Sequence, residues 1–506
     1  MTESKVYFDK VILMTLLSVL IFLGFKAILP DKIFPEVDTT NNKNIIIDDM
    51  MKAAMDAEKE GGAIADTTEI EPDPVAVNPI QGTDSTKTQT PTPTEVKEDS
   101  SVKDPTLSSG GYRNLSRFYA KLRKLETAKS GTVRIAYFGD SMTDGDLIVQ
   151  DLRRDLQDEY GGEGVGFVAI TSLSANGRYS VSHKYFKTWK TQTFLNTKKE
   201  PLSPYGISGQ VFFGNDSTKS YWVKYKAQGI KHSTLLNKPT LLYGKANNEA
   251  GSIAIKTDGQ DAVTKMLTPN KLLNTLKISD TNPKDLQVDF HHLDSIPVYG
   301  FNFDNGKGIH IDNYSLRGNS GLPLSVLNVP LMNAFDRALG GYDLVVLQYG
   351  ANVLNDDVEG YGWYTRGMQK VVENLRQCFP NADILIISTA DKSSKIEEEM
   401  KTSPAVALLL ASQKKCALNT ESGFINLYSL MGGNGSMIDW VAENNAGADY
   451  THFTASGAKK IAKLIHKDLI KGYNLYKKNV PEETADEDSG EPEAIEQKAN
   501  STTTTN

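Results

Sequence analysis

One short stretch restricts what this chain can fold into more than any other. Residues 133–139 are rich in β-branched and aromatic side chains, which is typical of a buried strand, and this run ends at Asp140-Ser141. Apolar residues then recur three to five positions apart over residues 147–156, as they do on one face of a helix. The stretch therefore predicts a strand, a tight turn and a helix.

Ser141 lies in this turn, at the carboxyl end of the predicted strand and the start of the predicted helix. Unpaired backbone N–H groups and the helix dipole favour developing negative charge at such a place, so it suits a nucleophile. A serine that only caps a helix has the same surroundings. The turn alone therefore leaves both interpretations of Ser141 open.

Two motifs far downstream favour the nucleophile. Asp449 and His452 lie three residues apart in a loop that precedes a predicted helix over residues 456–465. Asn352 lies just beyond a run of buried-strand residues at 344–347. A carboxylate, an imidazole and an amide would thus accompany the serine, and acyl-transfer chemistry uses these groups.

In order and spacing, these motifs resemble those of the SGNH (GDSL-type) superfamily of esterases and acyltransferases. The Gly-Asp-Ser sequence at 139–141 is similar to the nucleophile block, Gly-Ala-Asn at 350–352 to the asparagine block, and Asp-x-x-His at 449–452 to the terminal acid–histidine block. The resemblance covers roughly residues 115–473, apart from an insertion. It implies the α/β fold of the superfamily, a three-layer α/β/α arrangement with a flavodoxin-like parallel sheet.

The resemblance also implies a role for each site residue. Ser141 would attack the acyl carbon, His452 would accept and return the proton, and Asp449 would orient the imidazole. The oxyanion hole would consist of the backbone N–H groups of Ser141 and Gly318 and the side-chain amide of Asn352. This mechanism requires no metal and no organic cofactor.

Two positions fit the resemblance less closely. The glycine block at 317–321 offers both Gly318 and Gly321, of which Gly318 is preferred. Members of the superfamily often have an acidic residue right after the asparagine, where this chain has Val353. An α/β-hydrolase would instead need Gly-x-Ser-x-Gly, and residues 139–143 read Gly-Asp-Ser-Met-Thr, which argues against that fold.

The remaining catalytic sequence alternates between strands and helices. Strands are predicted at 309–314, 344–348, 383–388 and 423–427, and helices at 115–125, 364–378 and 404–418. Such alternation predicts a parallel sheet with helices on both faces and with functional sites at the carboxyl ends of its strands. The predicted site residues follow these strand ends or lie in the loop before the closing helix.

An insertion interrupts this domain. From 186 to 306 the sequence contains short alternating runs, such as 220–225 and 240–244, separated by turn signals, which predicts a β-sandwich. We therefore place the two parts of the catalytic domain at 112–185 and 307–478. Some envelope enzymes of the SGNH superfamily that act on acetylated bacterial polysaccharides carry a sandwich resembling a carbohydrate-binding module at this place. The resemblance thus implies a glycan as partner.

The beginning of the chain predicts membrane attachment. Residues 11–29 are apolar apart from Ser, Thr, Gly and Lys26, and as a helix they would span about 28 Å, close to the roughly 30 Å of a hydrocarbon core. A cleaved signal peptide is the alternative, but no small-x-small cleavage site follows. We therefore expect an uncleaved single-pass anchor. The flanking lysines decide no orientation, but a glycan partner in the envelope would make residues 1–10 a cytoplasmic tail and place the catalytic domain outside the cytoplasm, in the periplasm.

Polar segments of low complexity flank the catalytic domain. Residues 30–111 contain few aromatics and many Thr, Pro, Asp, Glu and Ser, which predicts a disordered tether. A helical pattern at 45–60 interrupts this segment and is interpreted as a transient helix. Residues 479–506 are acidic, finish in a Thr run and predict a disordered tail.

Other chemistries have weaker signals. The net charge of −8 gives no electrostatic basis for binding nucleic acid. The glycines at 161–166 lack the Lys-Ser/Thr ending of a phosphate loop, which favours a close-packed turn. His291 and His292 would point to opposite faces of a strand, so we predict no metal site. Cys378 and Cys416 end successive helices, and a disulfide between them is allowed in an oxidising compartment.

Taken with the resemblance, these features lead us to expect a serine esterase that removes O-acetyl or other acyl groups from a cell-envelope polysaccharide such as peptidoglycan or exopolysaccharide. An O-acyltransferase would use the same triad and would receive acyl groups from a membrane-bound donor partner. A non-catalytic glycan-binding protein of the same fold is a further alternative. The presence of Ser141, Asp449 and His452 together argues against it.

Overall fold

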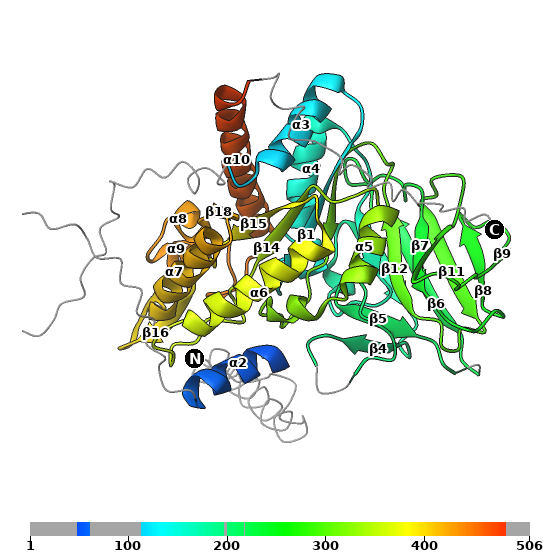
Figure 1. Ribbon diagram of the computed structural model, residues 1–506, viewed down its shortest axis with the longest axis horizontal. Helices are drawn as coiled ribbons and strands as arrows, with labels where there is room; N and C mark the ends of the chain where they lie inside the picture. Colours follow the sequence, from blue (N-terminus) through cyan, green and yellow to red (C-terminus); the bar gives the residue numbers. More distant parts are fainter. Residues whose placement is uncertain (1–47, 61–112, 197–199, 217, 482–506) are drawn as a thin grey trace, which may run out of the picture. The chain divides into compact units, whose positions relative to one another are not determined.

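A parallel sheet of five strands forms the centre of the structure, a computed structural model that describes residues 48–60, 113–196, 200–216 and 218–481. The strand order is β13-β1-β14-β15-β18 (Figure 1). The bounds are Thr132–Gly139 for β1, Gly308–Asn313 for β13, Leu344–Gln348 for β14, Asp383–Ile387 for β15 and Gly423–Ile425 for β18. If these five strands are renumbered by their order in the chain, their order across the sheet is 2-1-3-4-5, as in flavodoxin-like folds. The topological switch point therefore lies between β1 and β14.

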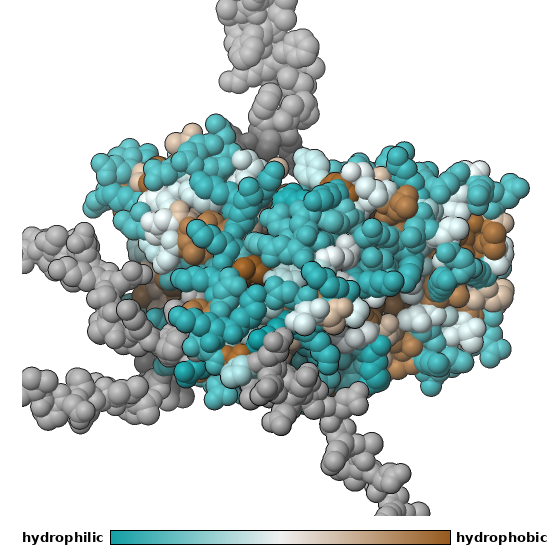
Figure 2. All heavy atoms as spheres, turned by 90° about the horizontal axis from the view of Figure 1, so that it is seen from above, coloured by the Kyte–Doolittle hydropathy of each residue, from teal (hydrophilic) through white to brown (hydrophobic). Residues whose placement is uncertain are grey.

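Helices cover both faces of this sheet, as the strand–helix alternation predicted. Side chains of β1 alternate between two hydrophobic clusters, with Ile135 and Tyr137 in one and Ala136 and Phe138 in the other. The first cluster includes α3 (Ser116–Ala128), α4 (Val149–Tyr160), α8 (Leu427–Met431), α9 (Ser436–Ala442) and α10 (Ala455–Asn479). The second includes α5 (Val329–Ala338), α6 (Gly362–Cys378) and α7 (Pro404–Asn419). The surface drawn in Figure 2 is mainly hydrophilic, because the large apolar side chains are inside.

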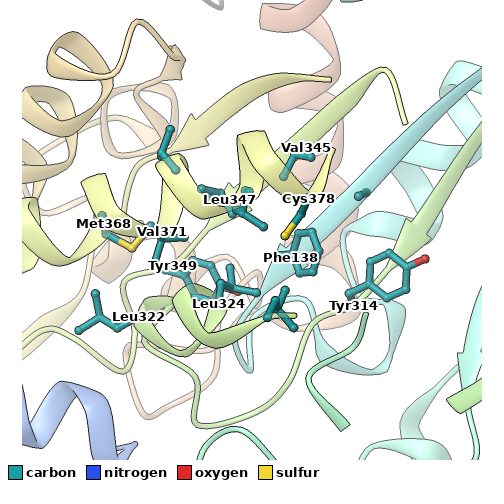
Figure 3. Packing of buried hydrophobic residues seen from close by; sticks show 14 of the residues in the cluster. Phe138, Tyr314, Leu322, Leu324, Val345, Leu347, Tyr349, Met368, Val371 and Cys378 are labelled. Atoms are coloured by element: carbon teal, nitrogen blue, oxygen red, sulfur yellow. The ribbon is translucent and has the colours of Figure 1, made fainter. Parts of the chain in front are cut away.

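The loops at the carboxyl edge of the sheet rest on the second cluster. Figure 3 shows Tyr349, just beyond β14, next to Leu324 of the short helix η3 (Leu322–Val326). Cys378 of α6 is buried in the same cluster, and both it and Cys416 are free thiols. Burial raises the pKa of each thiol to about 12. These cysteines therefore contribute to packing.

The insertion is a β-sandwich, as predicted. One of its antiparallel sheets has the order β10-β7-β12-β5-β4, with β2 also paired to β12, and the other has the order β3-β6-β11-β8-β9. The bounds are Gly166–Ala169 (β2), Val181–Tyr185 (β3), Lys190–Thr193 (β4), Gln210–Phe213 (β5), Tyr221–Ala227 (β6), Thr240–Gly244 (β7), Ser252–Thr257 (β8), Val263–Met266 (β9), Leu273–Lys277 (β10), Asp285–His291 (β11) and Val298–Phe303 (β12). Both sheets contribute side chains to one hydrophobic cluster, in which the rings of Tyr225 and Phe301 are in contact.

This sandwich begins earlier than residue 186, the start that the sequence predicted. β2 pairs with β12 and β3 pairs with β6, so both strands belong to the sandwich although they precede that residue. A strand of four or five residues does not reveal its partner when the partner lies far downstream. Strand pairing therefore corrects the boundary between the two domains.

The glycine-rich turn before β2 is close-packed, as predicted. Gly164 has φ +109°, and a Cβ at this position would lie 2.1 Å from the carbonyl oxygen of Phe303 in β12. A side chain would therefore force the backbone of the sandwich away from the turn. Three small elements complete the fold: η2 (Ala175–Gly177) and the hairpin of β16 (Ser393–Ile396) and β17 (Glu399–Thr402).

The helix α2 (Asp49–Glu60) corrects the interpretation of residues 45–60 as a transient helix in a tether. It packs against α6 and η3, and its Met51 is buried in the second cluster. Met51, Ala54 and Met55 recur at helical spacing, so this helix can bury one side against a partner. The sequence pattern alone does not show whether such a partner exists.

The predicted cytoplasmic tail, the membrane anchor, the rest of the tether and the acidic tail lie outside the described residues, in 1–47, 61–112 and 482–506. Within the described ranges, none of the helices combines the length and the apolarity needed to cross a bilayer. The anchor at 11–29 stays a prediction.

Candidate active site

The turn that carries Ser141 begins where β1 ends. A Cβ on Gly139 would lie 2.2 Å from the Thr143 hydroxyl oxygen, so the close turn requires glycine here. The Asp144 N–H donates to the Asp140 carbonyl oxygen at 3.0 Å and folds the chain back. Ser141 is thereby held at the carboxyl edge of the parallel sheet.

The helix after this turn starts later than the sequence predicted. The short helix η1 (Asp144–Asp146) comes first, and α4 follows only after Asp146 and Ile148, which have positive φ values of 69° and 63°. The buried ion pair of Asp146 with Arg153, at 2.9 Å, holds this bend. Ser141 is therefore not at the N-terminus of α4. Side chains and local N–H groups must stabilise the developing negative charge that the helix dipole was expected to stabilise.

Ser141, His452 and Asp449 lie in hydrogen-bond contact. Ser141 Oγ is 2.9 Å from His452 Nε2, and His452 Nδ1 is 2.7 Å from Asp449 Oδ2. An N–H group at Nδ1 would donate a hydrogen bond to the carboxylate, which leaves Nε2 as the acceptor for the serine hydroxyl. The structure thus brings together the three residues that the sequence predicted as nucleophile, base and orienting acid.

The Asp449 carboxylate also fixes the turn that carries Asp449 and His452. Asp449 Oδ1 accepts the backbone N–H groups of Thr451, at 3.1 Å, and His452, at 3.0 Å. Tyr450 adopts a positive φ of 51°, and the Gly447 N–H closes the turn by donating to the His452 carbonyl oxygen at 2.8 Å. Asp449 therefore orients both the imidazole and the loop that carries it.

The Asp449 carboxylate stays charged in an open site. Burial opposes its ionisation, but hydrogen bonds from the side chain and backbone of His452 outweigh this effect and lower the pKa of Asp449 to about 2. The side chains of His452 and Asp449 are 48% and 49% exposed. Solvent can therefore reach the imidazole.

Asp140 is a site residue that the sequence interpretation missed. Its buried carboxylate accepts the Met142 N–H at 2.9 Å through Oδ1 and the Gly350 N–H at 3.2 Å through Oδ2. Burial raises the pKa of Asp140 to about 6, although these hydrogen bonds oppose the shift. Its position directly before Ser141 in the Gly-Asp-Ser motif was the available signal, because an acidic residue at the end of a buried strand needs a partner.

Asn352, the predicted side-chain donor of the oxyanion hole, is connected to the glycine block. Its Nδ2 donates to the Asn319 carbonyl oxygen at 3.4 Å. An amide group has two hydrogens, and among the described residues we find no acceptor for the second one. That hydrogen is available to a ligand. Val353, in the place of the family's acidic residue, is buried in the hydrophobic core.

Gly318 and Gly321 differ in how their N–H groups are used. The Gly321 N–H donates to Asn319 Oδ1 at 2.9 Å, and a Cβ on Gly321 would lie 2.8 Å from the Tyr349 ring. Gly318 has φ +82°, and within the described ranges its N–H has no acceptor. Gly321 therefore serves the shape of the loop, whereas the Gly318 N–H is free to bind an oxyanion.

A small cavity lies beside Asp140 and the segments that follow β14 and β15, and neither Ser141 nor His452 lines it. It has a volume of about 20 Å³, and its lining includes Asp140, Gly350, Ala351 and Thr451. This is room for roughly one water-sized group. A long acyl chain does not fit in it.

No protein-family model matches the sequence, and no curated protein matches it either. Among solved structures, the chain is similar to a peptidoglycan O-acetylesterase with a TM-score of 0.58 and 20% identity, over 73% of this chain and 99% of that chain. It is also similar to a family two carbohydrate esterase from Cellvibrio japonicus, with a TM-score of 0.23 and 9% identity over 58% and 98% of the two chains. A third similar structure, an acetyl xylan esterase, has a TM-score of 0.24 and 17% identity, over 31% of this chain and 79% of that chain. The first similarity shows a shared fold, and the other two scores are too low to support an argument.

Proposed function

We propose that this chain, which has the fold of the SGNH (GDSL-type) hydrolases, is a serine esterase that removes O-acetyl groups from a cell-envelope polysaccharide such as peptidoglycan or exopolysaccharide. The observation that carries the proposal is the contact of Ser141 with His452, which is itself bonded to Asp449. The fold shared with a peptidoglycan O-acetylesterase supports the substrate class.

In the first half-reaction, Ser141 Oγ attacks the ester carbonyl carbon while His452 Nε2 accepts the hydroxyl proton. Asp449 stabilises the imidazolium that forms. The tetrahedral oxyanion accepts hydrogen bonds from the backbone N–H groups of Ser141 and Gly318 and from the amide of Asn352. The imidazolium then gives its proton to the sugar oxygen, the carbon–oxygen bond breaks, and the acetyl group stays on Ser141.

Water completes the cycle in the second half-reaction. His452 accepts a proton from water as the oxygen attacks the acetyl-serine carbonyl, and the proton then returns to Ser141 Oγ as acetate leaves. The half-exposed side chain of His452 gives water access to this position. Ser141, His452 and Asp449, together with the proposed oxyanion donors, account for every proton transfer in both half-reactions.

We also propose that the chain is anchored in the membrane by residues 11–29 with its catalytic domain outside the cytoplasm. The apolar run of the sequence supports the anchor, and a glycan substrate in the envelope supports the orientation. Protease added to intact spheroplasts should remove the catalytic domain. Protection of the domain would contradict the orientation.

The function is tested with acetylated polysaccharides and one substitution. The wild-type protein should release acetate from O-acetylated peptidoglycan or exopolysaccharide and should be labelled by a fluorophosphonate. Ser141→Ala should lose both, with kcat reduced by about 10⁶, while the circular dichroism spectrum stays the same. The exposed Ser220 offers a matched control, and Ser220→Ala should retain both properties. Acetate release by Ser141→Ala would refute the proposal.

A further inference from the structure

A carboxylate from outside the catalytic domain reaches the glycine block. Asp48 precedes α2 and is separated from the catalytic domain by residues 61–112, yet its side chain is only 1% exposed. Asp48 Oδ2 accepts the backbone N–H of Ser320 at 2.8 Å, and Oδ1 accepts the N–H of Met51 at 2.8 Å. One carboxylate therefore caps its own helix and holds the loop that carries Gly318.

Further contacts hold this segment in place. Met51 lies in the same hydrophobic cluster as Leu322 and Leu324, which immediately follow the glycine block. The Asp49 N–H donates to the Leu195 carbonyl oxygen at 3.2 Å, and Leu195 belongs to the turn after β4 in the sandwich. Figure 3 shows α2 beside the segment that carries Leu322. The position of Asp48 is thus fixed by packing and by backbone hydrogen bonds.

From Ser320 the hydrogen bonds lead to the proposed oxyanion hole. The Ser320 carbonyl oxygen, which belongs to the next peptide unit, accepts the Tyr364 hydroxyl at 2.8 Å, so Ser320 is held through both its N–H and its carbonyl group. The adjacent Asn319 accepts the amide of Asn352 on its carbonyl oxygen at 3.4 Å. A shift of the Ser320 peptide would therefore move the group that orients Asn352.

The chemistry of this contact favours a positioning role over packing alone. Burial raises the pKa of Asp48, and hydrogen bonds from Ser320 and Met51 oppose the shift. Placing a carboxylate here costs free energy that an apolar side chain would not cost. In return, a charged acceptor binds a backbone N–H more strongly than a neutral one. This strengthens the hold on one particular peptide, the one between Asn319 and Ser320.

We propose that Asp48 is a positioning residue of the active site, which holds the loop of residues 318–321 so that Gly318 and Asn352 point at the oxyanion. This inference rests on the proposed esterase function. It makes the segment of residues 48–56 part of the enzyme, although the segment lies before the catalytic domain in the sequence. Asp48 itself does not touch the reacting atoms and acts through Ser320 and Asn319.

The test is Asp48→Asn in the full chain. Asparagine has the same shape but replaces one acceptor oxygen with a donor, so it can accept only one of the two N–H groups. With a chromogenic aryl acetate, kcat per active site should fall about tenfold while KM stays nearly the same. Active sites are counted by saturating fluorophosphonate labelling, so that a smaller folded fraction is not mistaken for slower catalysis. The matched control is Asp56→Asn, an exposed carboxylate on the same helix, which should match the wild type.

A double-mutant cycle distinguishes the positioning role from general stabilisation. Asn352→Ala removes one of the two donors that Asp48 is proposed to position, so Asp48→Asn should cost less once Asn352 is gone than it costs in the wild type. Independent, multiplicative losses would overturn the inference, and so would equal kcat per site in Asp48→Asn and Asp56→Asn. A wild-type protein without esterase activity would overturn the proposed function and this inference together. An active wild type with unchanged Asp48→Asn would overturn the inference alone.

Discussion

The Asp140 carboxylate accepts a hydrogen bond from the Gly350 backbone N–H at 3.2 Å and so connects the ends of two paired strands, β1 and β14. These strands lie on either side of the switch point of the sheet, where doubly wound folds place their sites. Ser141 directly follows Asp140, and Asn352 comes two residues after Gly350. One buried carboxylate therefore sets the spacing between the nucleophile and the proposed oxyanion donor.

The raised pKa of Asp140 predicts a pH dependence of stability. Its pKa is about 6 in the folded protein, against an ordinary value of 3.8 for an aspartate, so between pH 4 and pH 6 the folded state holds a proton that the unfolded chain has lost. Stability from this group is therefore greatest at low pH and decreases as the pH rises through this window, by roughly 3 kcal/mol in total. Asp140→Asn has no such titration. Its deficit in melting temperature relative to the wild type should shrink between pH 4 and pH 7, and a constant deficit would contradict the assignment.

The Asp449 carboxylate predicts the result of an isosteric change. Asp449→Asn keeps an oxygen for the N–H groups of Thr451 and His452 but presents an amide N–H to the imidazole, which disfavours the tautomer that the mechanism needs. We expect kcat to fall by about 10⁴ with an unchanged circular dichroism spectrum. Asp439→Asn, at an exposed carboxylate in α9, serves as the control. A loss smaller than tenfold would mean that Asp449 does not orient His452.

The glycine-rich turn between the two domains provides a matched pair for stability. Ala at Gly164 would place its Cβ 2.1 Å from the Phe303 carbonyl oxygen at φ +109°, whereas Ala at Gly161 would have no atom within 4 Å at φ +75°. Gly161→Ala should cost about 1–3 kcal/mol, from its backbone conformation alone (φ 75°, ψ −177°), which essentially only glycine adopts. Gly164→Ala should cost about 4 kcal/mol or more, because strand β12 must move as well. Thermal unfolding measures both, and equal losses would show that the turn is not closely packed against the sandwich.

The positions of the proposed site residues could be predicted because each lies next to an element with a strong local pattern. Ser141 ends an apolar strand, Asn352 comes just after another, and Asp449 and His452 precede an amphipathic helix. The fold orders these ends along one edge of a parallel sheet. Local pattern and topology therefore agree at these positions.

The residues that support the site could not be predicted, because their partners are distant in the sequence. The Asp48 carboxylate binds the N–H of Ser320, 272 positions away, and the Asp140 carboxylate binds that of Gly350, 210 positions away. A backbone N–H has no sequence signature, so a carboxylate that binds one looks like any other acidic residue. The start of the sandwich was misplaced for the same reason, since β2 is identified only by its pairing with β12.

The openness of the triad leads to a prediction about the fate of the acyl group. An esterase and a transferase form the same acetyl-serine, and they differ in whether water or a sugar hydroxyl attacks it. Water is always present, so a transferase must bind its acceptor and keep water away from the serine ester. Here the side chains of His452 and Asp449 are about half exposed, which allows water to approach the base. We therefore expect hydrolysis to dominate.

The measurement follows acetyl groups from a chromogenic acetyl donor in the presence of glycan oligomers. Free acetate should form at the rate of chromophore release, and acetylated oligomer should stay a minor product even when the oligomer concentration is raised. Ser141→Ala run in parallel gives the uncatalysed background for both products. Acetylated oligomer that forms faster than free acetate would identify the chain as a transferase, because an acceptor would then outcompete water at an exposed acyl-enzyme.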